Sequence, residues 1–286
     1  MSSIEQQVQT IIQSIAEDPT LDTIGDANVQ ALKLGESGHF EPARQVLERA
    51  LAAMEVHHPD SRFNIAVILS NLGLQQMALE NYQAAKDLFR QAIAIREELF
   101  GPDDPRLAGY LQHLGQTMVQ ETGDNSLFNP DHTEARRILE RAFRLYEAAC
   151  KLETEEAADC MVGIATTYNS YHPPEEVAAR LSWSRRAAVT WEGLAGPESL
   201  KTANALFRVA WSSLYATGGP DLDAVFRAIA ICEKHEGALQ ENAKMFRSYQ
   251  FDLSLISGAP GASDDYVGQF RQHLNAIDPS LLADPH

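Results

Sequence analysis

Apolar and small residues recur along the chain with the spacing of helices that pack against one another. An alanine, a large apolar residue and a second alanine occur as Ala43-Leu47-Ala50 and again, 42 positions later, as Ala85-Phe89-Ala92. These positions share one face of an α-helix, with the large side chain standing between two small ones. A single helix pair cannot bury such a face alone, so the pattern predicts helical hairpins that stack side by side.

The 42-residue offset also relates other positions. Phe40 matches Tyr82, and the dipeptide Leu72-Gly73 matches Leu114-Gly115. We expect the aromatic residue to open the second helix of each hairpin. We expect the glycine to lie in the first helix, where a neighbouring helix approaches closely.

Weaker copies of the pattern extend the array. A third copy, Ala135-Leu139-Ala142, follows an insertion at 123–132, and blurred fourth and fifth copies continue to about residue 236. No segment shows the sustained alternation of a β-strand. The sequence therefore predicts an all-α, helical-hairpin solenoid with about five repeats, covered at each end by capping helices.

The expected boundaries follow from these copies. A capping helix at 1–23 precedes the repeats at 24–237, and further capping helices occupy 238–286 around a Gly/Pro loop at 257–263. Ser263 or Asp264 is the expected N-cap of the last helix.

Composition and charge narrow the possible partners. The chain has 23 Lys and Arg against 40 Asp and Glu, a formal net charge of −17. This charge repels nucleic acid and anionic lipid surfaces, whereas a basic protein or peptide is favoured electrostatically. The alternative is that the acidity only keeps a long surface soluble.

The cysteines and the N-terminus indicate a location. Cys150, Cys160 and Cys232 form no Cys-x-x-Cys pair, which argues against a disulfide framework. No signal peptide or membrane-spanning run is present. We expect a cytoplasmic protein.

Catalytic and metal-binding motifs are absent from the sequence. The nine histidines are scattered, and Cys232 with His235 supplies only two ligands. No nucleophile elbow or phosphate-binding glycine loop occurs. A polar cluster in the fourth repeat could hide acid and base groups: Asp159, Cys160, Tyr168, Tyr171 and His172. We predict no cofactor, no metal and no catalytic residue.

The segment from Ala78 to Gly115 resembles the long repeats of kinesin light chains. The matching features are Tyr82, Ala85, Ala92, Glu97, the run Phe100 to Pro105 and Ala108, and Leu-Ser-Asn-Leu-Gly at 69–73 is similar to that family's Leu-Asn-Asn-Leu-Ala box. The 42-residue period exceeds the roughly 34 residues of the standard tetratricopeptide repeat. The heptad region of kinesin light chains is absent, so a kinesin subunit is not expected.

This resemblance implies a tetratricopeptide-type, right-handed superhelix that binds extended peptides on a concave face lined by first helices. Carried over by position, that face includes Ser70, Asn71, Gln112, His113, Gln116, Thr166, Asn169, Phe207, Arg208, Trp211 and Tyr215. The alternative is that Asn71 and Gln112 are merely solvated. Phe207, Trp211 and Tyr215 form one stripe, which is either core or an apolar pocket with Arg208 as an anion clamp.

Three functions remain open. The first is a protein- or peptide-binding scaffold. The second is an enzyme or small-molecule-binding protein with a pocket near the irregular fourth and fifth repeats. The third is a cytosolic peptide sensor, similar to peptide-pheromone receptors but without a DNA-binding domain. The oligomeric state is not predicted.

Overall fold

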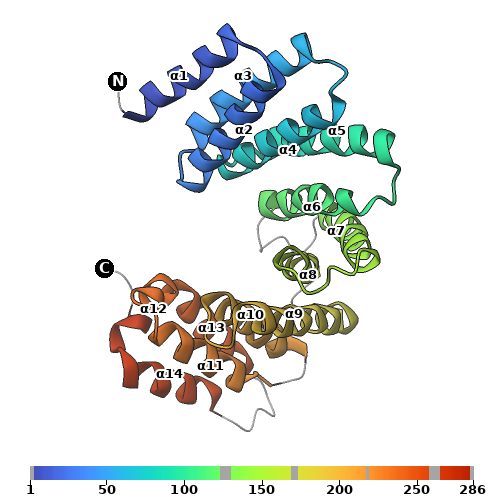
Figure 1. Cartoon of the computed structure of the whole chain (residues 1–286). Helices are drawn as coiled ribbons and strands as arrows, with labels where there is room; N and C mark the ends of the chain where they lie inside the picture. The colour runs from blue at the N-terminus through green and yellow to red at the C-terminus, as the bar shows by residue number, and fades with distance from the viewer. Residues whose placement is uncertain (1–2, 123–129, 169–172, 217–218, 258–264, 284–286) are drawn as a thin grey trace. The chain divides into compact units, whose positions relative to one another are not determined.

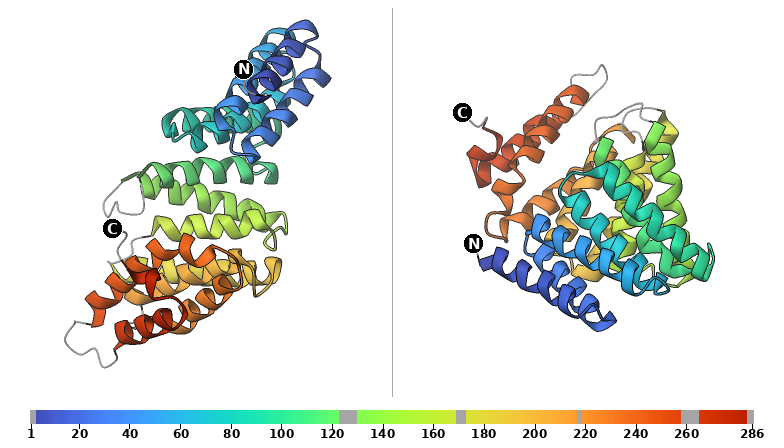
Figure 2. Two further views of the ribbon diagram at one scale, coloured as in Figure 1. Left: turned by 90° about the vertical axis from the view of Figure 1, so that its left-hand side faces the viewer. Right: turned by 90° about the horizontal axis from the view of Figure 1, so that it is seen from above.

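A computed structural model describes residues 3–122, 130–168, 173–216, 219–257 and 265–283 (Figures 1 and 2). These residues form fourteen α-helices and two short 3₁₀ helices, and no strand occurs among them. The predicted all-α helical solenoid is therefore confirmed. The chain separates into two compact units, unit 1 (Met1–Ala149) and unit 2 (Cys150–His286).

Unit 1 consists of helices that follow one another as packed pairs (Figure 1). Its elements are α1 (Ser3–Glu17), α2 (Leu21–Glu36), α3 (Phe40–His57), α4 (Arg62–Ala78), α5 (Tyr82–Phe100), η1 (Pro105–Leu107), α6 (Ala108–Thr122) and α7 (Pro130–Ala148). Helix α1 packs on α2 and α3, and the pairs are α2 with α3, α4 with α5, and α6 with α7. The first helices α2, α4 and α6 also contact one another in that order. We call the surface of these three helices the first-helix face.

The repeated small and large residues form the contact within each pair, as predicted. The knobs Leu47, Phe89 and Leu139 are completely buried. A Cβ atom placed on Gly73 would lie 2.8 Å from a ring carbon of Phe89, and one on Gly115 would lie 2.5 Å from Cγ of Leu139. Glycine at these two positions therefore allows the second helix to approach the first.

One stripe of α5 joins α4 and α6 through three different interactions. The Lys86 ammonium lies 2.5 Å from Glu121 of α6, and the Phe89 ring stacks on His113 of α6. Arg96 is buried, and its guanidinium carbon lies 4.6 Å from the ring centre of Phe63 in α4. The same carbon lies 5.1 Å from the ring centres of Phe100 and Tyr110. The three residues of α5 are spaced with the period of the helix, so their side chains lie on the side of α5 that packs against α4 and α6.

The turn after α5 explains the residues that carried the family resemblance. Gly101 has φ 87° and ψ 163°, a region that only glycine occupies without strain. Asp104 caps η1 by accepting the backbone N–H of Arg106, and the Pro102 carbonyl accepts from Arg141 of α7. Gly196 in unit 2 has nearly the same angles, φ 88° and ψ 160°, so the backbone adopts the same conformation at both glycines.

Unit 2 continues with further helix pairs and a terminal group of helices (Figure 2). Its elements are α8 (Glu155–Thr167), α9 (Pro174–Ala195), α10 (Leu200–Ala216), α11 (Leu222–Glu233), α12 (Ala238–Glu241), α13 (Ala243–Ser257), α14 (Tyr266–Ile277) and η2 (Pro279–Leu282). The pairs are α8 with α9 and α10 with α11, and α13 contacts α10. The core includes the fully buried side chains Phe246, Leu253, Phe270 and Leu274.

The terminal part differs from the expectation in its details. The helix predicted at 238–256 is divided at Asn242 into α12 and α13. The N-cap of α14 is Asp265, whose carboxylate accepts the Gly268 N–H at 2.7 Å, and not Ser263 or Asp264. Most of the predicted loop at 257–263 and of the insertion at 123–132 lies outside the described residues, and the division into repeats and caps stays a prediction.

The close approach at Gly115 predicts opposite effects for the same substitution at two helical glycines. At Gly25 in α2 a Cβ atom meets nothing within 4 Å, so Gly25→Ala is expected to stabilise the protein by about 0.5–1 kcal/mol. Gly115→Ala forces Leu139 aside and is expected to destabilise it by about 1–3 kcal/mol. Urea unfolding of both variants provides the measurement. Equal gains in stability would contradict the packing described here.

Candidate ligand-binding faces

Two of the predicted residues of unit 1 lie within its packing. Ser70 is buried in α4, and Gln112 is buried in α6. The hydroxyl of Tyr146 in α7 donates to Gln112 Oε1 at 2.8 Å. Gln112 therefore supports the α6/α7 pair, and its amide oxygen already has a partner.

Asn71 lies on the first-helix face and pairs with a residue of the neighbouring first helix. Its Nδ2 donates to Oδ1 of Asn28 in α2 at 2.8 Å, and both side chains are half-buried. Among the described residues, Asn71 Oδ1 and Asn28 Nδ2 have no other hydrogen bond. The pair therefore offers one acceptor and one donor side by side.

His113 and Gln116 occupy the same face of α6, and both are half-buried. The imidazole of His113 stacks on Phe89 with ring centres 5.7 Å apart. Its Nδ1 is buried with no hydrogen-bond partner among the described residues. Burial lowers the pKa of His113 to about 4, so the ring is neutral at pH 7.

The predicted aromatic stripe of α10 divides between core and surface. Phe207 is buried and packs on Phe246 with ring centres 5.3 Å apart, so it belongs to the core of unit 2. Trp211 and Tyr215 are half-buried, and the Trp211 ring centre lies 6.1 Å from that of Tyr249 in α13. Arg208 is exposed. Burial raises the pKa of Asp159, and the charges of Lys201 and Arg208 oppose this rise.

The remaining predicted residues of unit 2 lie near the end of α8. The hydroxyl of Thr166 donates to the Gly163 carbonyl within its own helix at 2.7 Å. Asn169 lies outside the described residues.

The polar cluster of the fourth repeat supplies no activated nucleophile among its described members. Cys160 is buried, and this burial raises the pKa of its thiol to about 12. The reactive form of cysteine is the thiolate, so this thiol is inert at neutral pH. Tyr168 ends α8, and its carbonyl accepts from Arg180. Tyr171 and His172 lie outside the described residues.

The described residues contain no cluster of three or more His, Cys, Asp and Glu side chains that could hold a metal ion. Cys232 accepts from Asn242 Nδ2 at 3.9 Å, whereas the ring of His235 lies 2.9 Å from the Glu198 carbonyl. Cys232 and His235 thus contact different groups and do not form a shared pair of ligands. In the described part of the chain, no helix is both long enough and apolar enough to cross a bilayer.

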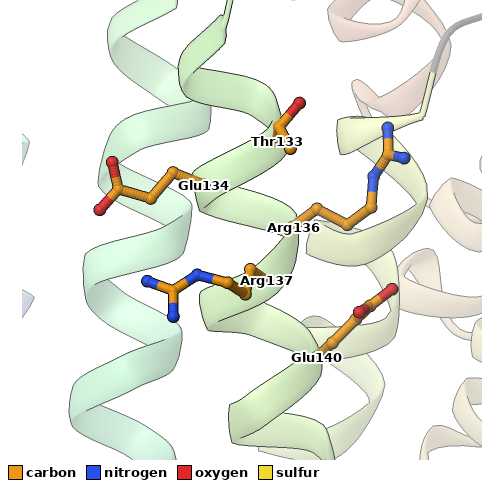
Figure 3. Close-up of a pocket in the computed structure, with 5 residues that line it drawn as sticks. All are labelled: Thr133, Glu134, Arg136, Arg137 and Glu140. Atoms are coloured by element: carbon orange, nitrogen blue, oxygen red, sulfur yellow. The ribbon is translucent and has the colours of Figure 1, made fainter.

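A hollow of about 540 Å³ lies on unit 1, and Figure 3 shows that all of its lining side chains come from α7. They are Thr133, Glu134, Arg136, Arg137 and Glu140. Side chains of a single helix cannot surround a ligand, whereas small-molecule sites bury most of their ligand. This hollow is therefore an open surface depression.

Sequence analysis missed Asn28 and Asp252. Asn28 lies 42 positions before Ser70, and Ala31 lies 42 positions before Gly73, so the repeat could have been extended back through α2. Asp252 is a buried carboxyl group in α13 beside Tyr215. No repeat pattern in the sequence marks its position.

The hydrogen bond between Tyr146 and Gln112 predicts a loss of stability on truncation. Gln112→Ala removes the acceptor of a buried hydroxyl and is expected to cost about 1–3 kcal/mol of unfolding free energy. Gln116→Ala removes the same amide group from a half-buried position and is expected to change stability by less than about 0.5 kcal/mol. Urea unfolding compares the two. A cost at Gln112 no larger than at Gln116 would refute a structural role for Gln112.

The lowered pKa of His113 predicts a pH dependence of stability. An unfolded histidine titrates near pH 6.5, and the folded ring titrates near 4, so the unfolded state binds more protons between these values. The contribution of neutral His113 to the free energy of unfolding is therefore fully present above pH 6.5. As the pH falls from 6.5 towards 4, this contribution decreases by about 1 kcal/mol per pH unit.

His113→Gln is expected to reduce this slope in urea unfolding measured from pH 7 to 4.5. The exposed His57 provides a matched control, and His57→Gln is expected to leave the slope unchanged. If both variants retain the wild-type slope, the ring of His113 titrates as it does in the unfolded chain.

The comparisons with known proteins agree with this architecture. Residues 64–126 match the family model of the tetratricopeptide repeat. No curated protein matches the chain in sequence. The match covers α4 and α5, where the 42-residue pattern is clearest.

Solved structures with the same fold include kinesin-light-chain-like repeats. TPR-like repeats ascribed to a kinesin light chain of Podosopora anserina have a TM-score of 0.56 and 16% identity, over 74% of this chain and 96% of that one. A variant of the same protein gives a TM-score of 0.57 at 16% identity, over 74% and 95%. BtubC (BKLC) from P. vanneervenii gives 0.53 at 17% identity, over 100% and 95%. At these identities the likeness concerns the fold alone. Residues 64–126 thus match the tetratricopeptide repeat, and the chain has the fold of a helical-repeat solenoid similar to kinesin-light-chain-type arrays.

Proposed function

We propose that the protein is an interaction scaffold that binds an extended segment of a protein partner along the first-helix face of unit 1. Stacked repeats expose long surfaces that suit extended ligands. The polar side chains on this face include amide and imidazole groups, which suit recognition of a peptide backbone.

The observation that carries the proposal is the amide pair formed by Asn28 and Asn71. Because Asn71 donates to Asn28, the pair leaves an acceptor on α4 and a donor on α2. A peptide unit presents one N–H and one C=O group, so it complements such a pair. His113 and Gln116 extend the same face along α6, and Val29 adds an apolar surface that is 48% exposed on α2.

The charge of the chain supports a basic ligand. With a net charge of −17, an acidic partner would be repelled, whereas a basic one would associate faster. Cys150, Cys160 and Cys232 form no disulfide bond, which supports a cytoplasmic location.

The proposal is tested by capturing proteins from a native lysate with wild type and with a face variant, Asn71→Ala with Gln116→Ala. Gln112 is left intact because its loss would disturb folding. We expect the face variant to lose, by at least about tenfold, proteins that wild type captures, because two backbone-matching amides are removed. Quantitative mass spectrometry measures the bound proteins.

The matched control is Gln83→Ala with Gln91→Ala. It removes two exposed amides from α5, the second helix of the α4/α5 pair, which is not part of the first-helix face. This control is expected to capture the same proteins as wild type. If the face variant and the control retain the same proteins, the first-helix face is not the binding surface.

A further inference from the structure

A buried carboxyl group lies between α10 and α13 of unit 2. The side chain of Asp252 in α13 belongs to a residue that is only 7% exposed. Its Oδ2 atom has no hydrogen-bond partner among the described residues. Burial raises the pKa of the carboxyl group, and the neighbouring Tyr215 of α10 opposes part of this rise.

No described cation forms an ion pair with this carboxyl group. The nearby Asp221 differs in this respect, because it caps α11 through the Ala224 N–H and lies 3.8 Å from Arg185. An ionised carboxylate that is removed from water without a cation is costly. Asp252 therefore gives this part of unit 2 a preference for a positive group that the described residues do not satisfy.

Aromatic residues of α10 and α13 lie next to the carboxyl group: Tyr215 and Tyr249 interact with it, and Trp211 contacts Tyr249. Trp211 and Tyr215 lie one turn apart on α10, and both remain half-buried. The Trp211 ring packs towards Tyr249, whose hydroxyl is buried with no hydrogen-bond partner among the described residues. The pKa of Tyr249 is raised by burial and then by Asp221 and Asp252, so its hydroxyl is neutral. Ring faces attract cations, and guanidinium groups in particular stack on them.

Exposed apolar side chains flank the carboxyl group on α13. Phe251 is 64% exposed and Leu255 is 57% exposed. Leu255 lies three positions after Asp252, so the two share a side of the helix, and Phe251 directly precedes Asp252. A ligand that reaches Asp252 would therefore also contact apolar surface.

We propose that unit 2 binds an arginine or lysine side chain of a partner segment, with Asp252 as the counter-charge and with Trp211 and Tyr215 packed against the cationic group. Phe251 and Leu255 accept apolar residues next to that basic residue. The proposal deepens the proposed function, since the basic side chain belongs to a protein ligand, but its residues lie in unit 2 and not in the first-helix face of unit 1.

Two short peptides test the site directly. The probe is acetyl-Leu-Arg-Leu-amide, and its matched control carries citrulline, which has nearly the shape of arginine but no charge. Tryptophan fluorescence of the full-length chain is titrated with each peptide. We expect saturable binding of the arginine peptide that is at least about tenfold tighter than binding of the citrulline peptide. Equal binding of the two peptides overturns the proposal.

Two variants, each lacking one carboxylate, test whether the preference for the arginine peptide depends on Asp252. Asp252→Asn has the same size, and it is expected to fold with equal or higher thermal stability because a buried charge is removed. It should bind both peptides equally. Asp223→Asn removes the same charge from an exposed position on α11 and should keep the tenfold preference. A preference that persists in Asp252→Asn overturns the proposal.

A variant of an exposed residue keeps the test independent of folding. Phe251→Ser changes a mostly exposed side chain, and it is expected to weaken both peptides while the preference for arginine remains. Unchanged affinity in Phe251→Ser contradicts the proposed apolar contact.

The Asn71→Ala, Gln116→Ala variant should keep the full peptide preference, because its changes lie in unit 1. Failure of one proposal is thereby distinguished from failure of the other.

Discussion

The packing of unit 1 depends on the side chain of Phe89, which contacts the helices on both sides of α5. Its ring fills the space that Gly73 leaves open on α4. The same ring stacks on His113 of α6, so one side chain connects three consecutive helices. Any side chain at Gly73 would push this ring away from α4 and disturb the contact with α6 as well. The small residue and the large knob therefore set the spacing within a pair and also between pairs.

This constraint decides which positions of the first helices remain available to a ligand. Ser70 and Gln112 are 42 positions apart and are buried, whereas the next positions, Asn71 and His113, stay half-buried. Because one turn of helix is 3.6 residues, a shift of one position rotates a side chain by about 100° and moves it from the packed interior to the edge. The proposed binding surface is consequently a narrow row beside the core, and the core contacts position it.

The fold could be predicted from the sequence because its constraints are local and repeated. Gly115 and the aromatic openings at Phe40 and Tyr82 occur at the 42-residue offset, and Leu139 keeps the same local spacing after the insertion. Each has the predicted role. The site could be predicted only in part. A repeat assigns a residue to a helix, but it does not fix rotation finely enough to separate buried Gln112 from half-buried Gln116.

The side-chain contacts between different helices, and the choice of a helix cap, could not be predicted from the sequence either. The partner of Asn71 is Asn28, which lies 43 positions earlier and therefore breaks the 42-residue offset. The N-cap of α14 is Asp265, although its neighbour Asp264 has the same side chain, because capping depends on the backbone angles at the start of the helix. Only the folded backbone distinguishes such adjacent candidates.

Arg96 and Asp252, two of the buried ionisable side chains among the described residues, show why an aromatic environment is not equivalent to a counter-ion. Arg96 faces the rings of Phe63, Phe100 and Tyr110, and the negative faces of these rings stabilise a guanidinium group. The same quadrupole offers a carboxylate at Asp252 no comparable attraction, because a ring face repels an anion. Arg96 therefore completes the packing of α4, α5 and α6 through rings of its own unit. Asp252, beside Tyr215, has no cation among the described residues that would offset its burial, and we propose that the nearby rings help to hold one from a partner.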